Sequence, residues 1–448
     1  MTRTIAFVID LMQDVNIQRP LFGLAAALPD TEAIILASHL FLKRDTSGVW
    51  LGELKEASAT LGLPLHSFAT EFEAYKHLQG RRGVIVASAE STVSGHALAH
   101  NIFLSAPAGF VRITLQHGFE CVGFLHNAAH DRAHGRRVGF NADVVCGWFA
   151  EDVLTSFSTA ERSKLLVTGP TLLLPQWDQM AIAMGLEVEE LPPEAGSSEE
   201  QTLAEAPAVE ADQPLPEAEG DSSAAAPSDE AAVITETVDE EAVVDYAFEA
   251  FAYGMAVQTD YPAPQPEPEP EPVIETTSAY SCLICENLHS VRMAGSVLKS
   301  DFIAQFTDFA GQAAKQDIDV WLRPHPAGRF MEVRGAALPP NVRMSTLPVY
   351  KENLSRFNFA VSAPSSILFD LMTAGVPVAV WQDAEGDIDR RNYAGLPTLS
   401  CIDDWWAFAA EAATGRERLL AQQAEFIRRL MIPDNVLERY ATLLGSYG

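Results

Sequence analysis

The sequence predicts an α/β protein with two Rossmann-like parallel-sheet domains that face a cleft, and with a long acidic segment between them. Short, wholly apolar runs alternate with helical stretches in both halves of the chain. This pattern is typical of parallel strands that are covered by helices on both faces. Between the halves, the composition changes to Ala, Pro, Glu, Ser and Asp. A chain of 448 residues with 48% hydrophobic content is long enough to bury two cores of ordinary size.

The N-terminal half contains six apolar runs that we expect to be parallel strands. The connections between them are long enough to hold crossover helices. We assign residues 1–175 to this first domain. The expected strands are Thr4 to Ile9, Ala33 to Ala37, Gly83 to Ala87, Arg112 to Leu115, Asp143 to Cys146 and Lys164 to Thr168.

A second series of strands and helices begins near Tyr280, and we assign residues 278–400 to a second domain and 401–448 to C-terminal helices. We expect Asp301 to begin the first helix as a capping residue. In such domains the ligand site lies outside the carboxyl ends of the strands, here in the cleft between the two sheets. The expected strands are 281–285, 319–322, 359–362 and 377–381, and the expected helices are 301–314, 349–355 and 366–374.

The segment between the domains, residues 176–277, is predicted to be a disordered linker. Residues 186–277 of this segment carry 25 of the 61 acidic residues and no Lys or Arg. Their like charges repel one another, and so polar a segment buries little apolar surface. A Pro-Glu repeat at its end favours a stiff, extended spacer. Residues 243–257 carry aromatic and apolar side chains at roughly helical spacing. They form either a transient helix without a function or a segment that folds on a protein partner.

Outside residues 186–277, 36 acidic residues oppose 30 basic ones, so a local phosphate site is not repelled by the whole molecule. No basic stripe with interleaved aromatics is present, which argues against nucleic acid as a partner.

Five cysteines without the density of a disulfide framework indicate a reducing compartment, and we expect the cytoplasm. We interpret Cys282 and Cys285 as buried strand residues. The N-terminus resembles a strand rather than a signal peptide, and no apolar run is long enough to span a bilayer, so membrane contact would be peripheral.

Two motifs in the second domain carry residues suited to phosphate. Arg323-Pro324-His325-Pro326 directly follows a predicted strand, where Arg and His can donate hydrogen bonds to phosphate oxygens from a stiff loop. The alternative is a rigid turn with a structural histidine. In Ser362-Ala-Pro-Ser365-Ser366-Ile-Leu-Phe-Asp370 a strand ends and a helix begins, which places two hydroxyls beside free backbone N–H groups. The alternative there is ordinary helix capping.

In the first domain, His117 follows a predicted strand and precedes Gly118. A histidine at a cleft-facing strand end has an ordinary pKa near 6.5, which suits it to take a proton from an acceptor hydroxyl. A structural histidine before a tight turn is the alternative, and Glu120 is a second candidate base. Three histidines are spaced four residues apart, so on a helix they would share a face: His126, His130 and His134. They could be metal ligands or an acceptor- or phosphate-binding surface. The interpretation we favour is a solvated helix or loop.

Taken together, these motifs resemble bacterial glycosyltransferases of the GT-B type. Three motifs of the second domain look like the donor domain of two families. They are the strand followed by Arg-Pro-His-Pro, the run from Ser362 to Asp370, and the following Ala374-Gly-Val-Pro377. These are the CDP-glycerol glycerophosphotransferases and the capsule polysaccharide transferases of sialic acid or Kdo. The strand ending in Thr114-Leu-Gln-His-Gly118 is similar to the strand-then-His-Gly of the glycerophosphotransferases, although Phe119-Glu120 replaces their Thr-Pro.

The resemblance implies a metal-independent glycosyltransferase without a cofactor. It would move a sugar or glycerol phosphate from a nucleotide-activated donor, with cytidine as the expected base, to a glycan or lipid-linked acceptor in surface-polysaccharide biosynthesis. Donor phosphates would be held by Arg323, His325, Ser365 and Ser366, while His117 or Glu120 would act as the base in the acceptor domain. The alternative function is a non-catalytic GT-B-like scaffold that recruits a protein partner through the acidic linker.

Overall fold

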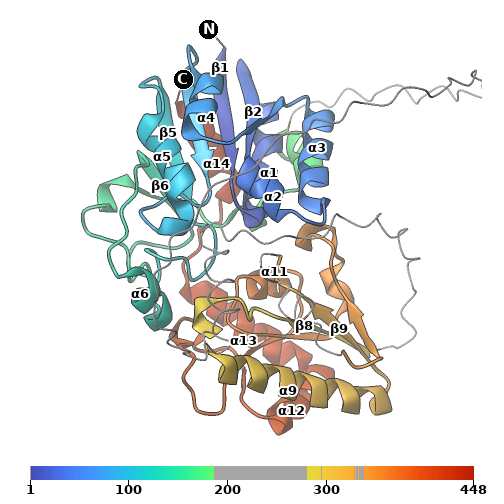
Figure 1. Ribbon diagram of the computed structural model, residues 1–448. Coiled ribbons are helices and arrows are strands. Elements are labelled where there is room, and N and C mark those ends of the chain that lie inside the picture. Colours follow the sequence, from blue (N-terminus) through green and yellow to red (C-terminus); the bar gives the residue numbers. More distant parts are fainter. Residues whose placement is uncertain are drawn as a thin grey trace, which may run out of the picture.

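A computed structural model describes residues 2–185, 280–293, 295–326, 328, 331 and 338–447. These residues form two α/β domains that lie one above the other in Figure 1. Almost all of the predicted linker, including residues 243–257, falls outside the described residues, so its disorder and its possible docking segment stay predictions.

The N-terminal domain is built on seven parallel strands in the order β3-β2-β1-β4-β5-β6-β7. All six predicted runs are strands. The edge strand β3 escaped prediction because only Phe68 of its four residues is buried, which leaves no apolar run. The strands are β1 (Arg3–Ile9), β2 (Thr31–Ser38), β3 (Leu65–Phe68), β4 (Gly83–Ala87), β5 (Phe110–Leu115), β6 (Val144–Gly147) and β7 (Leu165–Val167).

Helices cover both faces of this sheet, which is why its strands are apolar throughout. In β1, Ile5 and Phe7 belong to the cluster formed with α1 and α3, whereas Ala6 and Val8 belong to the cluster formed with α4 and α5. The N-terminal helices are α1 (Met12–Ala27), α2 (His39–Arg44), α3 (Val49–Leu61), α4 (Glu71–Leu78), α5 (Ala97–Ser105), α6 (Ala128–His134) and α7 (Met180–Ala183).

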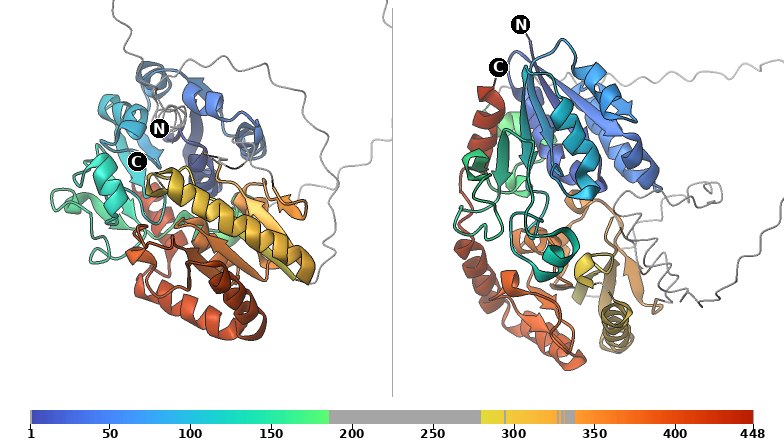
Figure 2. Two further views of the ribbon diagram at one scale, coloured as in Figure 1. Left: turned by 60° about the horizontal axis from the view of Figure 1, so that its bottom comes forward. Right: turned by 60° about the vertical axis from the view of Figure 1, so that its left-hand side comes forward.

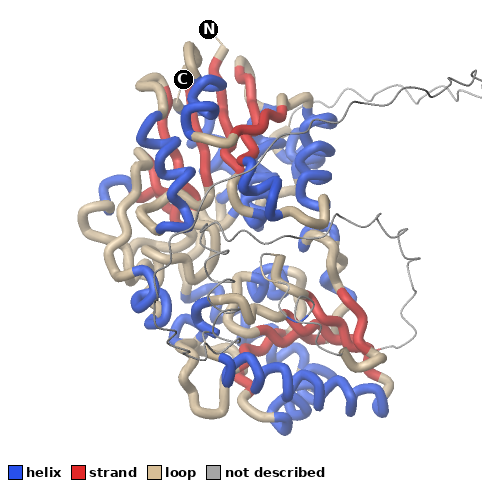
Figure 3. The backbone as a smooth tube through the Cα atoms, viewed as in Figure 1, coloured by secondary structure: helices blue, strands red, loops and turns tan. Residues whose placement is uncertain are grey.

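The C-terminal domain contains a second parallel sheet of six strands in the order β10-β9-β8-β11-β12-β13 (Figure 3). Cys282 and Cys285 lie in β8 and are buried, as predicted. The short strands β10 and β13 were not predicted. The strands are β8 (Tyr280–Cys285), β9 (Ile318–Arg323), β10 (Val342–Met344), β11 (Phe359–Ser362), β12 (Val378–Trp381) and β13 (Thr398–Leu399).

Two local predictions for this domain are wrong. The first helix begins at Ser296, so Asp301 lies inside it and accepts a hydrogen bond from Gln305 Nε2, one turn later, at 3.0 Å. Residues 349–355 do not form an α-helix but parts of two 3₁₀ turns, because the backbone between the turns is extended at Glu352, with φ −82° and ψ 129°. The helices are α9 (Ser296–Ala313), α11 (Ile367–Thr373), α12 (Ile402–Thr414), α13 (Arg416–Arg429) and α14 (Val436–Ser446). No helix within the described ranges is long and apolar enough to cross a membrane.

The last helix, α14, returns to the N-terminal domain and packs beside its sheet (Figure 2). Tyr440 is 1% exposed, and its hydroxyl donates to Gly169 O and accepts from Thr168 Oγ1, each at 3.0 Å. Arg439 adds a bond to Val167 O at 2.8 Å. The chain therefore crosses between the domains twice, and its end completes the core of the first domain.

We expect Tyr440→Ala to lower the free energy of unfolding by about 3–5 kcal/mol, because it removes a buried ring and two buried hydrogen bonds. Denaturant unfolding followed by circular dichroism measures this loss. The control Phe72→Ala removes an aromatic ring that is 64% exposed, and its effect should be within about 0.5 kcal/mol. Equal effects of the two changes would show that α14 does not support the N-terminal core.

Candidate functional site

The carboxyl ends of β8, β9 and β11 bring the predicted donor-site residues to one edge of the C-terminal sheet. From β8 the chain connects to β9 on one side, whereas β11 lies on its other side, so the order of strands reverses between β8 and β11. Such a reversal leaves a crevice in which open α/β sheets bind their ligands. The Arg-Pro-His-Pro motif follows β9, and the Ser-Ser motif follows β11.

Two histidines from neighbouring strands pack against each other at this edge. The ring of His325 lies 3.8 Å from that of His289, measured between ring centroids, with a tilt of 32°. They meet because Cys285 and Arg323 are paired across β8 and β9, and each histidine follows its strand by a few residues. A Cβ atom at Gly328 would lie 2.5 Å from His289 Cβ, so the loop after β9 requires a glycine at this close approach.

Cationic side chains surround the pair. Burial lowers the pKa of His289 to about 4, and the charge of Lys299 adds to this shift. Burial also holds the pKa of His325 well below its ordinary value, and the neighbouring imidazole and two arginines, Arg292 and Arg323, contribute in the same direction. The rings are therefore uncharged at neutral pH, within a positive local field that favours an anion.

Arg323 is held in place by its own domain. Its guanidinium donates to Ser345 Oγ at 3.1 Å and to Leu347 O at 2.8 Å, and the side chain is 7% exposed. Burial raises the pKa of Asp370 to about 7, although the Arg323 charge opposes the shift. The charge of Arg323 thus lies near the carboxyl edge of the C-terminal sheet, and its guanidinium is held by two residues that follow β10.

The Ser-Ser motif lies at the start of α11, but one of its hydroxyls binds the other domain. Ser366 is the residue before the helix, and its Oγ accepts a hydrogen bond from Phe119 N at 2.8 Å. A Cβ at Gly118 would lie 2.9 Å from the same oxygen, which explains the glycine in the His-Gly motif. The hydroxyl hydrogen of Ser366 can still be donated to a ligand, since only the oxygen is used in this contact. Ser365 is buried nearby.

His117 lies in the N-terminal domain beside a thiol. Cys121 Sγ is 3.2 Å from His117 Nδ1, and burial raises the pKa of this thiol to about 12. Burial lowers the pKa of His117 to about 4, against the effect of a hydrogen bond with the backbone of Ser88. His117 is therefore a neutral imidazole at neutral pH, with hydrogen-bonding contacts on both sides of the ring, and its role as a base stays a prediction.

A further histidine, His96, was not singled out from the sequence. Its ring centroid lies 5.3 Å from that of His117, and its Nδ1 is 2.7 Å from Ser91 Oγ. The available signal was its position in the loop after β4, the strand next to β5 in the sheet. His289 could have been found in the same way, because it lies in the loop after β8, the strand paired with β9, and β9 leads to His325.

The three regularly spaced histidines do not share one helix face. His126 precedes α6 and lies 2.7 Å from Asp131, while His130 and His134 lie in the helix with ring centroids 6.4 Å apart. Within the described part of the chain, no group of three or more His, Cys, Asp or Glu side chains could hold a metal ion. Only His130 and His134 thus lie in a helix, whereas His126 lies in the loop before it.

Glu120 is buried at the contact between the domains. Its carboxylate forms an ion pair with Arg292 and accepts a hydrogen bond from Asn392 Nδ2 at 2.7 Å, and its side chain is 1% exposed. The next segment adds a bond from Ala128 N to Asp389 Oδ2 at 3.0 Å. Glu120 therefore joins the first domain to the second, and its role as a base stays a prediction.

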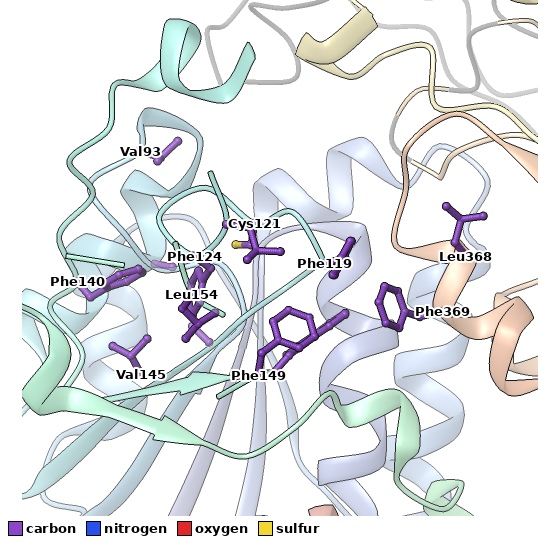
Figure 4. Close-up of a cluster of buried hydrophobic side chains, with 14 of the residues drawn as sticks. Val93, Phe119, Cys121, Phe124, Phe140, Val145, Phe149, Leu154, Leu368 and Phe369 are labelled. Atoms are coloured by element: carbon purple, nitrogen blue, oxygen red, sulfur yellow. The ribbon is translucent and has the colours of Figure 1, made fainter. Parts of the chain in front are cut away.

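An aromatic cluster adjoins this ion pair. The ring of Phe119 lies 4.6 Å from that of Phe369 and 5.0 Å from that of Tyr393, both of the C-terminal domain. Figure 4 shows Phe369 facing Phe119 and Phe149 across the contact. A second contact joins Tyr350 to Glu53 through a hydrogen bond of 2.8 Å. The two domains are thus fixed face to face by apolar packing and by buried charge.

A hollow of about 500 Å³ lies at one side of this contact. None of the six site residues predicted from the sequence lines this hollow. Its walls come from the loop after β12, including Gln382, Asp389 and Arg390, and from Ala128 at the start of α6.

Solved structures with the same arrangement of two domains are known. S. aureus MnaA, in a co-structure with UDP, is 12% identical, with a TM-score of 0.51 over 99% of this chain and 96% of that one. A candidate UDP-N-acetylglucosamine 2-epimerase from Listeria monocytogenes is 10% identical, with a TM-score of 0.50 over 99% and 95%. The sequence matches no protein-family model and no curated protein. At these identities the likeness establishes the fold: two parallel-sheet domains in the GT-B arrangement.

We expect Arg292→Ala to lower the free energy of unfolding by about 3–5 kcal/mol, because it leaves the Glu120 carboxylate buried without its cation. The double variant Glu120→Gln with Arg292→Ala should lose less than Arg292→Ala alone, since no unpaired charge remains. Denaturant titrations of the three proteins measure both effects. The control Arg428→Ala, in an exposed ion pair with Glu425, should leave the midpoint unchanged. A double variant less stable than Arg292→Ala would contradict this account of the contact.

Proposed function

We propose that this protein is a GT-B enzyme that transfers a sugar or glycerol phosphate from a nucleotide-activated donor, and that the donor phosphates bind at the carboxyl ends of β8, β9 and β11. The observation that carries the proposal is the packed pair His289 and His325, with Arg292 and Arg323 beside it, at the point where the strand order reverses. Imidazole and guanidinium N–H groups are donors that diphosphates prefer.

The chemistry of such a site is electrostatic. When a nucleotide leaves the donor, negative charge develops on its phosphate oxygens, and fixed cations and N–H donors lower the energy of that state. Arg323 suits this task because its two hydrogen bonds hold it rigid before a ligand arrives. The cytidine base and a surface-polysaccharide acceptor rest on the resemblance of the Arg-Pro-His-Pro and Ser-Ser motifs and belong to this proposal.

The acceptor would approach from the N-terminal domain, where His96 and His117 lie side by side. We favour His117 over Glu120 as the base, because Glu120 forms an ion pair with Arg292, whereas His117 contacts an uncharged thiol and a backbone group. A neutral imidazole can take the proton of an acceptor hydroxyl as it attacks the donor.

A thermal-shift panel of CMP, CDP, UDP and GDP tests the donor site. One nucleotide should raise the melting temperature, because a ligand that binds only the native state adds about 2.7 kcal/mol at a concentration of 100 times its Kd. His325→Asn should abolish most of this rise and leave the melting temperature of the free protein close to that of the wild type. The double variant Ser365→Ala with Ser366→Ala should weaken the rise as well.

His77→Asn is the matched control, since His77 stacks on His66 with ring centroids 4.3 Å apart, on the outer edge of the N-terminal domain. It should keep the full nucleotide response. If no nucleotide stabilises the wild-type protein, the donor site is refuted and the scaffold alternative is favoured. If His325→Asn keeps the full response, His325 is a structural residue.

A further inference from the structure

We infer that the N-terminal domain completes the donor site: the backbone N–H of Phe119 positions the Ser366 hydroxyl so that its hydrogen is donated to a donor phosphate. This inference rests on the proposed function. It makes Gly118 and Phe119 positioning residues for a ligand that the other domain binds. The observation behind it is the hydrogen bond from Phe119 N to Ser366 Oγ, 2.8 Å long, between residues 247 positions apart in the chain.

The peptide unit that carries this N–H is oriented by the side chain of Gln116. Gln116 Nε2 donates to Gly118 O at 2.9 Å, and Gln116 Oε1 accepts from Trp148 N at 2.9 Å. Gly118 O and Phe119 N belong to one planar trans peptide, so their C=O and N–H bonds point in opposite directions. Holding the carbonyl therefore aims the N–H at Ser366. Gln116 is 1% exposed, so its hydrogen bonds do not compete with water.

The start of α11 is held from both domains. Phe119 contacts it twice, through its N–H at Ser366 and through its ring, which lies 4.6 Å from that of Phe369. Ser366 and Phe369 are one turn apart and share a face of the helix. In its own domain, the loop before α11 is held by Asn287 Nδ2, which donates to Pro364 O at 2.7 Å. The position of the Ser366 oxygen is therefore fixed before a ligand binds.

The contact decides what the Ser366 hydroxyl offers to a ligand. A serine hydroxyl has one hydrogen to donate and two lone pairs that accept. The Phe119 N–H takes up a lone pair, and a hydroxyl that accepts one hydrogen bond donates its own hydrogen more strongly. Ser366 is only partly buried, and it lies between β11 and α11 at the carboxyl edge of the sheet. Its hydroxyl thus suits a phosphate oxygen, which only accepts.

Gly118→Ala tests this arrangement from the other domain. Among the described residues, a Cβ at this position would meet only Ser366 Oγ, at 2.9 Å, apart from its chain neighbours. The backbone of Gly118 does not have a positive φ, so alanine fits it without strain. The new methyl group should displace the hydroxyl and little else.

Isothermal titration calorimetry of the full chain with CDP and with UDP measures the effect. For the nucleotide that binds the wild-type protein, Gly118→Ala should raise the Kd by about tenfold, the loss expected for one hydrogen bond to a charged group. The melting temperature of the free protein should stay close to that of the wild type. The matched control is Gly52→Ala in α3 of the same domain, where a Cβ meets nothing within 4 Å. It should keep the wild-type Kd.

A double-mutant cycle shows whether Gly118 acts through the hydroxyl. Ser366→Ala should raise the Kd by a similar factor. Adding Gly118→Ala to Ser366→Ala should raise it no further, because without the oxygen the new Cβ meets no other side chain. A merely structural role of Gly118 would lower the melting temperature in both backgrounds and would give no such dependence of the Kd on Ser366.

The backbone amide of Phe119 provides a test that needs no variant. Triple-resonance NMR of the deuterated wild-type protein assigns its signal. At saturation with the bound nucleotide, the amide proton should shift downfield, because an oxygen that donates its own hydrogen to an anion becomes a stronger acceptor. This measurement decides the question even if Gly118→Ala fails to fold.

The outcomes separate this inference from the proposed function. Suppose that a nucleotide binds the wild-type protein. Then an unchanged Kd of Gly118→Ala, full additivity with Ser366→Ala, or a Phe119 amide signal that does not move downfield refutes the positioning role, while the donor site stands. If none of CMP, CDP, UDP and GDP binds the wild-type protein, the proposed function and this inference fail together.

Discussion

The buried ion pair of Glu120 and Arg292 constrains the whole arrangement of the protein. A carboxylate removed from water is stable only with a hydrogen-bonded cation, and here the carboxylate and the guanidinium come from different domains. The buried rings of Phe119, Phe369 and Tyr393 pack against one another across the same contact. The two sheets are therefore held in one orientation, with the strand ends that carry His117 and His325 on facing edges.

This contact also connects the parts of the candidate site. Arg292 pairs with the first domain and lies near enough to His325 to lower its pKa. Ser366 belongs to the predicted donor motif, yet its oxygen accepts the backbone N–H of Phe119. The residues that hold the domains together are thus the neighbours of those that we propose bind the donor. A movement that opened the cleft would change the charge and the hydrogen bonds at the donor site.

The sequence was informative where one local pattern determines the structure. Strands buried on both faces, such as Gly83–Ala87, were predicted to the residue, whereas the half-exposed strand Leu65–Phe68 has no apolar run to detect. Asp301 looked like a helix cap, but α9 already begins five residues earlier, at Ser296. The motifs found His325 but not His289, because their contact depends on the pairing of β8 with β9. Likewise, the ion pair of Glu120 with Arg292 could not be predicted from the sequence, because the two residues lie 172 positions apart.

A crystal structure of the protein with a bound nucleotide sugar tests the central claim most directly. The account predicts that the diphosphate lies in the cleft, with its oxygens within hydrogen-bonding distance of the side chains of His289 and His325. A diphosphate bound elsewhere, for example in the hollow lined by Gln382 and Arg390, with both histidines still packed against each other and untouched, would contradict it.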